Sequence, residues 1–228
     1  MYMIFDPTYI IIVPALLLSL YAQFKVQSTF SKYLNIPSKM GETGFTVARK
    51  LLDSKGLYSI QVEVTRGRLS DHYDPISRVI RLSEDVYYGN SISSISVAAH
   101  ETGHAIQHAE GYSPLMLRHR LFKVANIGSN LSWVFIILGI LFTASNLILI
   151  GIIFFTGAVA FQVITLPVEF NASARALKLL ESNHILYSDE IGSAKSVLGA
   201  AALTYVAAAL TSILELARLI LIYNRSND

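Results

Sequence analysis

The sequence predicts a mainly α-helical membrane protein with about four membrane-spanning helices and a small β-sheet or hairpin. Hydrophobic residues make up 53% of the 228 residues, charged residues make up 15%, and the mean hydropathy is +0.48. Soluble domains carry about 25% charged residues, so much of this chain is expected to face lipid. Two polar regions, 25–123 and 167–195, interrupt the apolar stretches. We expect both regions to fold with the spans as one integrated domain, 1–228.

Composition also excludes some classes of protein. The net charge is +2, and no basic stripe is present, so a nucleic-acid partner is not expected. Cysteine is absent, which excludes disulfides and thiolate ligands and leaves His, Asp and Glu for any metal site. Nothing in the composition indicates the oligomeric state.

The first span is expected near residues 3–22. Met1 to Tyr21 carries a single charge, Asp6, and is long enough to cross a bilayer core of about 30 Å. No basic residue precedes this apolar run, and no small-residue cleavage site follows it. This pattern favours a membrane anchor over a removed signal peptide.

Short elements are expected in the first polar region. Residues 44–52 have the pattern of an amphipathic helix that ends at Gly56. Residues 60–64 alternate as a strand does, and residues 78–83 form a second short strand. The stretch between them, 67–75, is rich in turn residues. A small sheet or hairpin is therefore expected in this part of the chain.

The longest apolar stretch is expected to form a membrane hairpin. Residues 131–166 contain no charged residue, and a single helix of this length would be far too long for a membrane. Ser145-Asn146 offers a turn near the middle. We therefore expect two spans, 131–146 and 147–166.

The last span is expected at residues 197–217. This stretch is rich in Ala and Leu, and its small residues suit close helix packing in lipid. Glu215 and Arg218 mark its end or pair within the helix bundle.

A metal-binding motif lies at the end of the first polar region. His100-Glu101-Thr102-Gly103-His104 has the pattern His-Glu-Xaa-Xaa-His. On a helix, His100 and His104 lie one above the other, so both imidazoles can bind one tetrahedral zinc. Glu101 lies about 100° round the helix, where it can act as a base beside the metal. The same motif could arise by chance from two surface histidines on either side of a glutamate. The opposite side of this helix is apolar and suited to packing, however, which favours a metal site on the polar side. Gly111 is expected to end the helix.

A catalytic zinc needs three protein ligands and one open position. His108 is expected to be a polar neighbour, because it lies about 80° from His100 two turns along the helix. A carboxylate on a later helix is the remaining option. Glu169 stands out, since it follows Pro167, is expected near the start of a helix, and returns to the same membrane side as His100. The competing carboxylates belong to a polar stretch with the pattern of a solvated face: Glu181, Asp189 and Glu190.

Three segments resemble the YugP-type neutral zinc metallopeptidases, a family of small bacterial membrane proteins. They are Ser70–Pro75, Val97–His108 and Leu166–Ser173, and the likeness extends over nearly the whole chain. The sequence is more distantly similar to the HtpX-type and CAAX prenyl endopeptidases. Zinc is the cofactor that these resemblances imply, with a gluzincin-like ligand set.

In the distant relatives the third zinc ligand is the Glu of a Glu-aromatic-Xaa-Ala-Asp motif. That motif corresponds to Glu169–Ser173, so the resemblance implies Glu169 as the third ligand. Ser173 departs from it, because those enzymes have Asp there. The carboxylate that orients a zinc histidine would then be missing, or it would come from elsewhere, such as Asp71 or Asp74.

These observations predict a membrane-bound zinc endopeptidase with a protein or peptide substrate. Zinc held by His100, His104 and Glu169 would acidify a water molecule. Glu101 would take the proton as general base, and the hydroxide would attack the peptide carbonyl. Three further side chains could contact the substrate or its oxyanion, although a structural role is favoured for each of them: His72, Tyr73 and Arg175.

The strand at 78–83 is a candidate for pairing with an extended peptide, and an ordinary structural hairpin is the alternative. Cleavage within the bilayer is disfavoured, because no Asp lies in an apolar run after the motif to serve as a ligand there. A non-catalytic membrane metal-binding or scaffolding protein remains the alternative function, and it would not need Glu101.

The distribution of basic residues predicts the orientation in the membrane. Thirteen Lys and Arg residues lie from Lys25 to Lys123, whereas none precedes the first span or lies at Ser145-Asn146. The positive-inside rule then places the N-terminus outside and the zinc helix at the cytoplasmic face of the bacterial plasma membrane.

Overall fold

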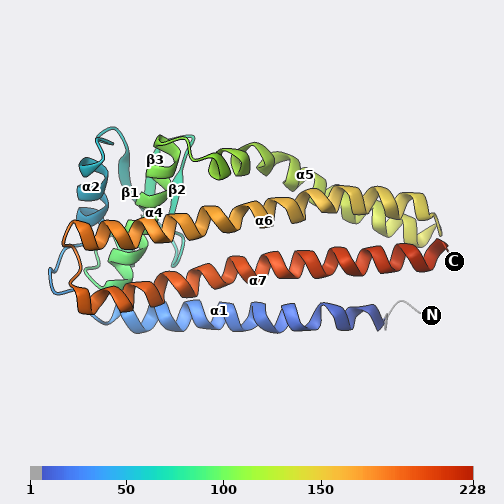
Figure 1. Cartoon of the computed structure of the whole chain (residues 1–228), viewed down its shortest axis with the longest axis horizontal. Coiled ribbons are helices and arrows are strands. Elements are labelled where there is room, and N and C mark those ends of the chain that lie inside the picture. The colour runs from blue at the N-terminus through green and yellow to red at the C-terminus, as the bar shows by residue number, and fades with distance from the viewer. Residues whose placement is uncertain (1–6, 228) are drawn as a thin grey trace. The chain divides into compact units, whose positions relative to one another are not determined.

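The structure is a computed structural model that describes residues 7–227. A 3₁₀ helix, Pro7–Ile11, comes first. The helices are α1 (Val13–Leu34), α2 (Gly44–Ser54), α3 (Glu84–Tyr87), α4 (Ile92–Ala109), α5 (Ser113–Leu141), α6 (Ser145–Ser182) and α7 (Ser188–Asn227) (Figure 1). The strands are β1 (Gln61–Thr65), β2 (His72–Asp74) and β3 (Val79–Ser83).

The chain forms two compact units. The helical unit comprises Met1–Gln23, Met116–Pro167 and Thr204–Asp228, and the α/β unit comprises Phe24–Leu115 and Val168–Leu203. Helices α1, α5, α6 and α7 each contribute residues to both units. That the two units act as one integrated domain stays a prediction.

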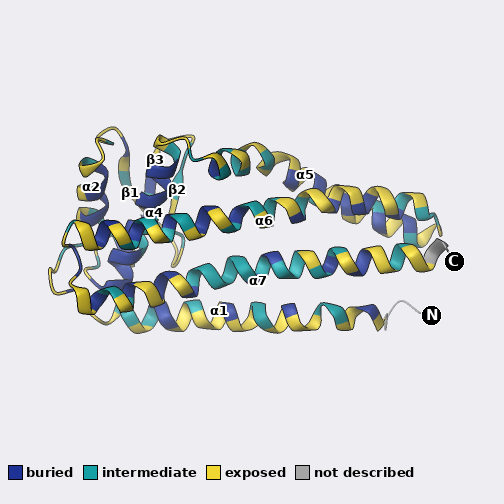
Figure 2. Cartoon of the chain, in the orientation of Figure 1, coloured by how far each residue is buried: buried dark blue, intermediate teal, exposed yellow. Residues whose placement is uncertain are grey.

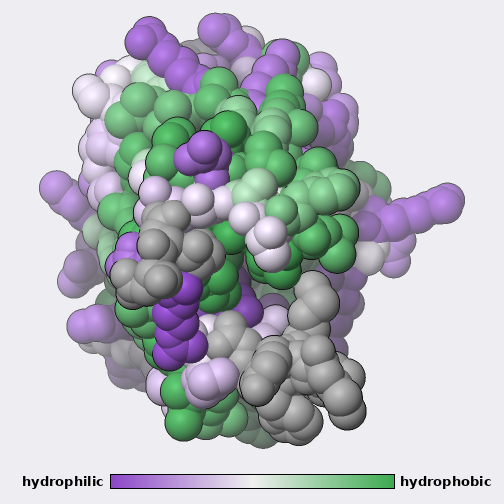
Figure 3. Space-filling view, turned by 90° about the vertical axis from the view of Figure 1, so that its right-hand side faces the viewer, coloured by the Kyte–Doolittle hydropathy of each residue, from purple (hydrophilic) through white to green (hydrophobic). Residues whose placement is uncertain are grey.

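Three helices in the described part of the chain are long and apolar enough to cross a membrane: α5, α6 and α7. Large apolar side chains such as Ile127, Leu141 and Ile153 are exposed on them. Figure 2 shows exposed positions in yellow along these helices, and Figure 3 shows apolar residues over much of the face that it presents. The expected last span lies within α7. The first expected span stays a prediction, because α1 is not among the three helices and residues 3–6 lie outside the described part.

The membrane hairpin differs in detail from the expected spans 131–146 and 147–166. Helix α5 begins at Ser113 and ends at Leu141, and α6 begins at Ser145. The connecting turn is therefore at residues 142–144, so placing the turn at Ser145-Asn146 was wrong.

A helix cap without glycine explains this difference. The Ala144 N–H donates to the Gly139 carbonyl at 2.8 Å, and Thr143 has a positive φ of 52°. This is the Schellman arrangement, in which glycine normally takes the left-handed position. Because threonine occupies that position here, the usual sequence signal for the helix end is missing.

Helix α6 also differs from expectation at Pro167. The helix continues through the proline from Ser145 to Ser182, so Glu169 lies in its interior and not near a helix start. Proline removes one backbone donor, and membrane helices tolerate this loss where neighbouring groups satisfy the freed carbonyl. The expectation that Glu169 lies near the start of a helix was therefore wrong.

The three strands form one sheet in the order β1-β3-β2. Strand β1 pairs in parallel with β3 from Gln61↔Val79 to Thr65↔Ser83, and β2 pairs antiparallel with β3. The expected strands correspond to β1 and β3, whereas β2 lies in the stretch expected to be turns. Since β3 is central and has a strand on both sides, the hypothesis that residues 78–83 pair with a substrate was wrong.

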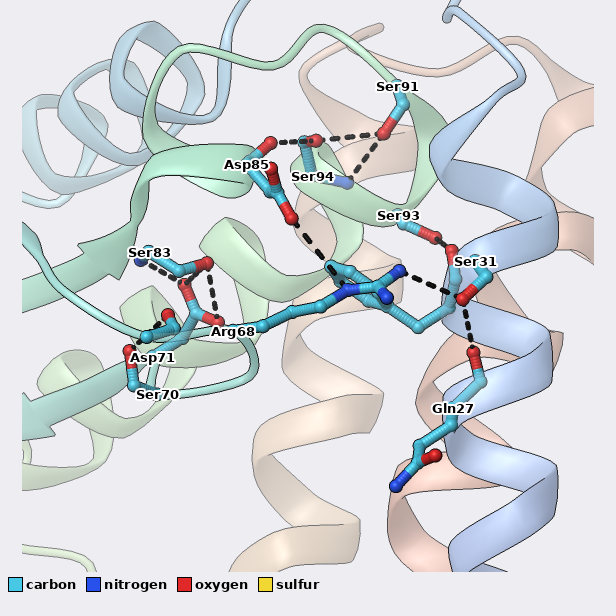
Figure 4. A network of polar contacts seen from close by, with 12 residues as sticks. Gln27, Ser31, Arg68, Ser70, Asp71, Ser83, Asp85, Ser91, Ser93 and Ser94 are labelled. Atoms are coloured by element: carbon cyan, nitrogen blue, oxygen red, sulfur yellow. Dashed lines mark hydrogen bonds and ion pairs between the residues drawn. The ribbon is translucent and has the colours of Figure 1, made fainter.

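Helix α4 is the buried centre of the α/β unit (Figure 2). Ser91 caps it by accepting from the Ser94 N–H at 3.1 Å (Figure 4). One hydrophobic cluster joins α4 to α2 and the sheet, through Ala98, Ala105, Ala48, Leu52, Ile80 and Leu82. A second joins α4 to α2, α6 and α7, through Ile95, Ala99, Ile106, Leu51, Leu180 and Leu198.

A polar network holds the segment that leads into β2 (Figure 4). Arg68 donates through Nη2 to Ser31 Oγ at 2.8 Å, and its Nε lies 3.8 Å from Asp85 Oδ2. Asp71 accepts from the backbone N–H of Ser83 at 2.7 Å and from its hydroxyl at 3.0 Å. These contacts tie β2 to α1, α3 and β3, and so fix its position beside α4.

Gly103 allows α4 and α6 to approach closely. A Cβ built at Gly103 would lie 2.8 Å from the Ala172 carbonyl oxygen, a backbone atom that cannot rotate away. Any larger residue at position 103 must therefore push the two helices apart.

We expect Gly103→Ala to lower both stability and zinc affinity. Overpacking of this kind costs about 1–3 kcal/mol, which exceeds the gain of about 0.5–1 kcal/mol from replacing a helical glycine by alanine. Gly192→Ala is the matched control, because nothing lies within 4 Å of its Cβ position on α7. Thermal unfolding and zinc titration of both variants test this expectation, and wild-type behaviour of Gly103→Ala would contradict it.

Candidate metal centre

Three potential metal ligands converge in the α/β unit. His100 and His104 lie one turn apart on α4, and Glu169 reaches them from α6. One ligand atom from each residue lies within 4.8 Å of the other two. The centroids of the two imidazole rings are 4.7 Å apart, and the angle between the ring planes is 85°. The spacing of the motif and the close contact at Gly103 together produce this arrangement.

The distances between these atoms fit a tetrahedral zinc. Glu169 Oε2 lies 3.3 Å from His100 Nε2 and 3.4 Å from His104 Nε2. Zinc bonds of about 2.0–2.1 Å at tetrahedral angles separate neighbouring ligands by about 3.3–3.4 Å. A charge-assisted hydrogen bond would be shorter, at about 2.7–2.9 Å. The residues present therefore fit a zinc ion better than a simple ion pair.

Each imidazole has a partner on its other nitrogen. His100 Nδ1 lies 3.2 Å from Ser173 Oγ, and His104 Nδ1 lies 3.0 Å from Gln107 Oε1. Ser173 thus occupies the orienting position despite lacking a carboxylate.

The alternative orienting groups, Asp71 and Asp74, bind elsewhere. Asp71 accepts hydrogen bonds from Ser83, and Asp74 accepts from Arg81 at 2.9 Å. Within the described residues, neither is hydrogen-bonded to a motif histidine, so the suggestion that Asp71 or Asp74 supplies the orienting carboxylate was wrong.

Glu101 lies on α4 between the two histidines but outside the ligand group. Glu101 is 7% exposed, and the backbone of Tyr73 on β2 lies near its carboxyl group. Burial raises the pKa of Glu101 to about 7. A carboxyl group with such a pKa is matched to proton transfer near neutral pH.

The other candidate contacts are arranged differently. Tyr73 contacts helix α4, where its hydroxyl is 2.8 Å from His108 Nδ1. His72 is exposed, and its Nδ1 lies 2.8 Å from the Ser70 carbonyl oxygen. Arg175 donates to Asn171 and Glu110 and stacks on Tyr112, and its contacts are taken up below.

The competing carboxylates lie outside the ligand group. Glu181 is exposed on α6, and Asp189 forms an ion pair with Lys39. Glu190 accepts from the backbone N–H groups of Lys39 and Tyr187, each at 2.9 Å.

Sequence reasoning missed Gln107 and Asn171. Gln107 is fully buried and connects His104 to α6, where Asn171 accepts from it at 2.9 Å. The only available signal was spacing, because each residue lies within one helical turn of a proposed ligand. Polar residues at such positions are common on any amphipathic helix.

Comparison with known proteins agrees with this geometry. A family model described as "Putative neutral zinc metallopeptidase" matches residues 8–224. The chain is 52% identical over 216 residues to the "Putative membrane protease YugP" of Bacillus subtilis (strain 168), covering 95% of this chain and 96% of the relative. No solved structure matches the chain. The match spans nearly the whole sequence, and the chain therefore belongs to the zinc peptidase family described as "Putative neutral zinc metallopeptidase".

Proposed function

We propose that this protein is a membrane-bound endopeptidase that hydrolyses peptide bonds in protein substrates, with zinc held by His100, His104 and Glu169. The observation that carries the proposal is the convergence of these three ligand atoms within 4.8 Å, with Glu101 beside them. The B. subtilis relative is named as a membrane protease, and the three apolar helices agree with a membrane location.

The chain's own residues supply the parts that such a reaction needs. When bound, zinc acts as a Lewis acid that lowers the pKa of water to about 7 and polarises a carbonyl group. Glu101 takes the proton from the attacking water and returns it to the leaving amine. Ser173 and Gln107 hold the two imidazole rings.

The alternative function is a non-catalytic membrane metal-binding or scaffolding protein. It would use the same three ligands, because metal binding alone explains their convergence. It gives no role to a buried carboxyl group that lies beside the ligands without belonging to the ligand group. Glu101 therefore distinguishes the two functions.

We also propose the orientation in the membrane and a fourth span near the N-terminus. The basic residues that precede the apolar hairpin place the α/β unit on the cytoplasmic side, with the N-terminus outside. The turn at residues 142–144 would then face the opposite side.

Glu101→Gln should retain zinc and lose at least about a hundredfold in cleavage rate, because the amide cannot take a proton. Zinc content and cleavage of an unstructured protein by the purified variant measure this. Glu181→Gln, an exposed change on α6, is the control and should cleave at the wild-type rate. Wild-type cleavage by Glu101→Gln would contradict the mechanism.

Glu169→Gln should lower zinc affinity at least about tenfold, because a neutral amide replaces the only anionic ligand. Glu181→Gln and Asp189→Asn should bind zinc as the wild type does. The measurement is zinc occupancy of purified protein after mild chelation. Equal occupancy in Glu169→Gln and wild type would assign the third position to another residue.

Cysteine labelling tests the orientation, and the chain has no cysteine of its own. Lys55→Cys, at the exposed end of α2, should not react with an impermeant maleimide in intact cells and should react after lysis. Asn146→Cys, exposed at the start of α6, should react in intact cells. The reverse pattern would show the opposite orientation.

A further inference from the structure

Gln107 is a buried amide placed between a proposed ligand and helix α6. Its Oε1 lies 3.0 Å from His104 Nδ1, and its Nε2 donates to the Val168 carbonyl at 2.8 Å and to Asn171 Oδ1 at 2.9 Å. The side chain is 0% exposed, so water does not compete for these contacts. All hydrogen-bonding groups of the amide thus face protein atoms.

The Val168 carbonyl determines which way this amide points. A backbone carbonyl can only accept, so the nitrogen of Gln107 must face Val168 and its oxygen must face His104. An amide oxygen can only accept as well. His104 must therefore carry a proton on Nδ1, and as a neutral imidazole it presents an unprotonated Nε2 to Glu169.

Asn171 and Arg175 extend this directional chain to the protein surface. Asn171 Oδ1 accepts from Gln107 and also from Arg175 Nε at 2.7 Å. Arg175 Nη1 donates to Glu110 Oε2 at 2.6 Å. Because a guanidinium group can only donate, it fixes the orientation of the Asn171 amide, which in turn supports that of Gln107.

His100 has no equivalent constraint. Its Nδ1 faces the hydroxyl of Ser173 at 3.2 Å, and a hydroxyl can donate or accept. The two imidazoles therefore differ, since the tautomer is imposed at His104 and adjustable at His100.

We propose that Gln107 is a positioning residue that holds His104 in its metal-binding tautomer, and that Asn171 and Arg175 hold Gln107 in turn. This inference rests on the proposed zinc site. It gives Arg175 a positioning role in place of the substrate contact considered from the sequence. Groups that orient a metal-binding histidine typically contribute about 10–100-fold to metal affinity.

The test compares zinc affinity and histidine tautomer in full-length, detergent-purified variants. Gln107→Leu removes the acceptor and should weaken zinc binding about 10–100-fold. In the metal-free protein, ¹⁵N spectra of labelled histidine should show His104 protonated on Nδ1 in the wild type. The same spectra should show loss of this fixed tautomer in Gln107→Leu. A purely structural role would leave the tautomer unchanged.

Two variants at Asn171 provide a matched comparison if Gln107→Leu does not fold. Asn171→Asp keeps an acceptor for both Gln107 and Arg175, so its zinc affinity should stay within about threefold of wild type. Asn171→Leu frees the Gln107 amide to rotate and should lose at least about tenfold. Wild-type affinity and tautomer in Gln107→Leu, or in Asn171→Leu, would overturn the proposal. An incorrect assignment of the zinc site would be recognised separately, because Glu169→Gln would then bind zinc as tightly as the wild type does.

Discussion

The close approach of α4 to α6 at Gly103 is the contact on which the metal centre depends. The motif places only two ligands on α4, and the third must come from another helix. The approach of Ala172 to Gly103 brings Glu169 to 3.3 and 3.4 Å from the two histidines. Without a residue as small as glycine at this position, the carboxylate would lie too far away to share a metal with both imidazoles.

The same approach creates a second requirement, because it buries polar groups. Glu101, His104, Gln107 and Glu169 are all buried, and a buried polar group without a partner costs about 1–3 kcal/mol. His104, Gln107 and Glu169 have partners, and these contacts join α4 to α6. Satisfaction of buried polar groups thus determines how the imidazoles are oriented. The close approach of α4 and α6 therefore underlies both the local structure and the proposed chemistry.

Local patterns predicted much of this fold. Glycine marked the ends of α2 and α4, and Gly56 and Gly111 both take the expected left-handed conformation. Where Thr143 and His184 take that conformation, no glycine signal was present. Strand β2 was missed because three residues within a turn-rich stretch show no clear alternation, and tertiary pairing with β3 defines the strand. Pro167 suggested a helix boundary that packing overrides.

The ligands were accessible from the sequence through motif spacing and family resemblance, whereas their orienting groups were not. Gln107, Asn171 and Ser173 act across two helices, so their roles depend on a helix contact that no local pattern encodes. The most direct test of the central claim is a crystal structure of the zinc-loaded protein with anomalous data at the zinc edge. We predict one anomalous peak about 2.0–2.2 Å from Nε2 of both histidines and from a Glu169 carboxylate oxygen. A peak that lacks any one of these three neighbours would contradict the account.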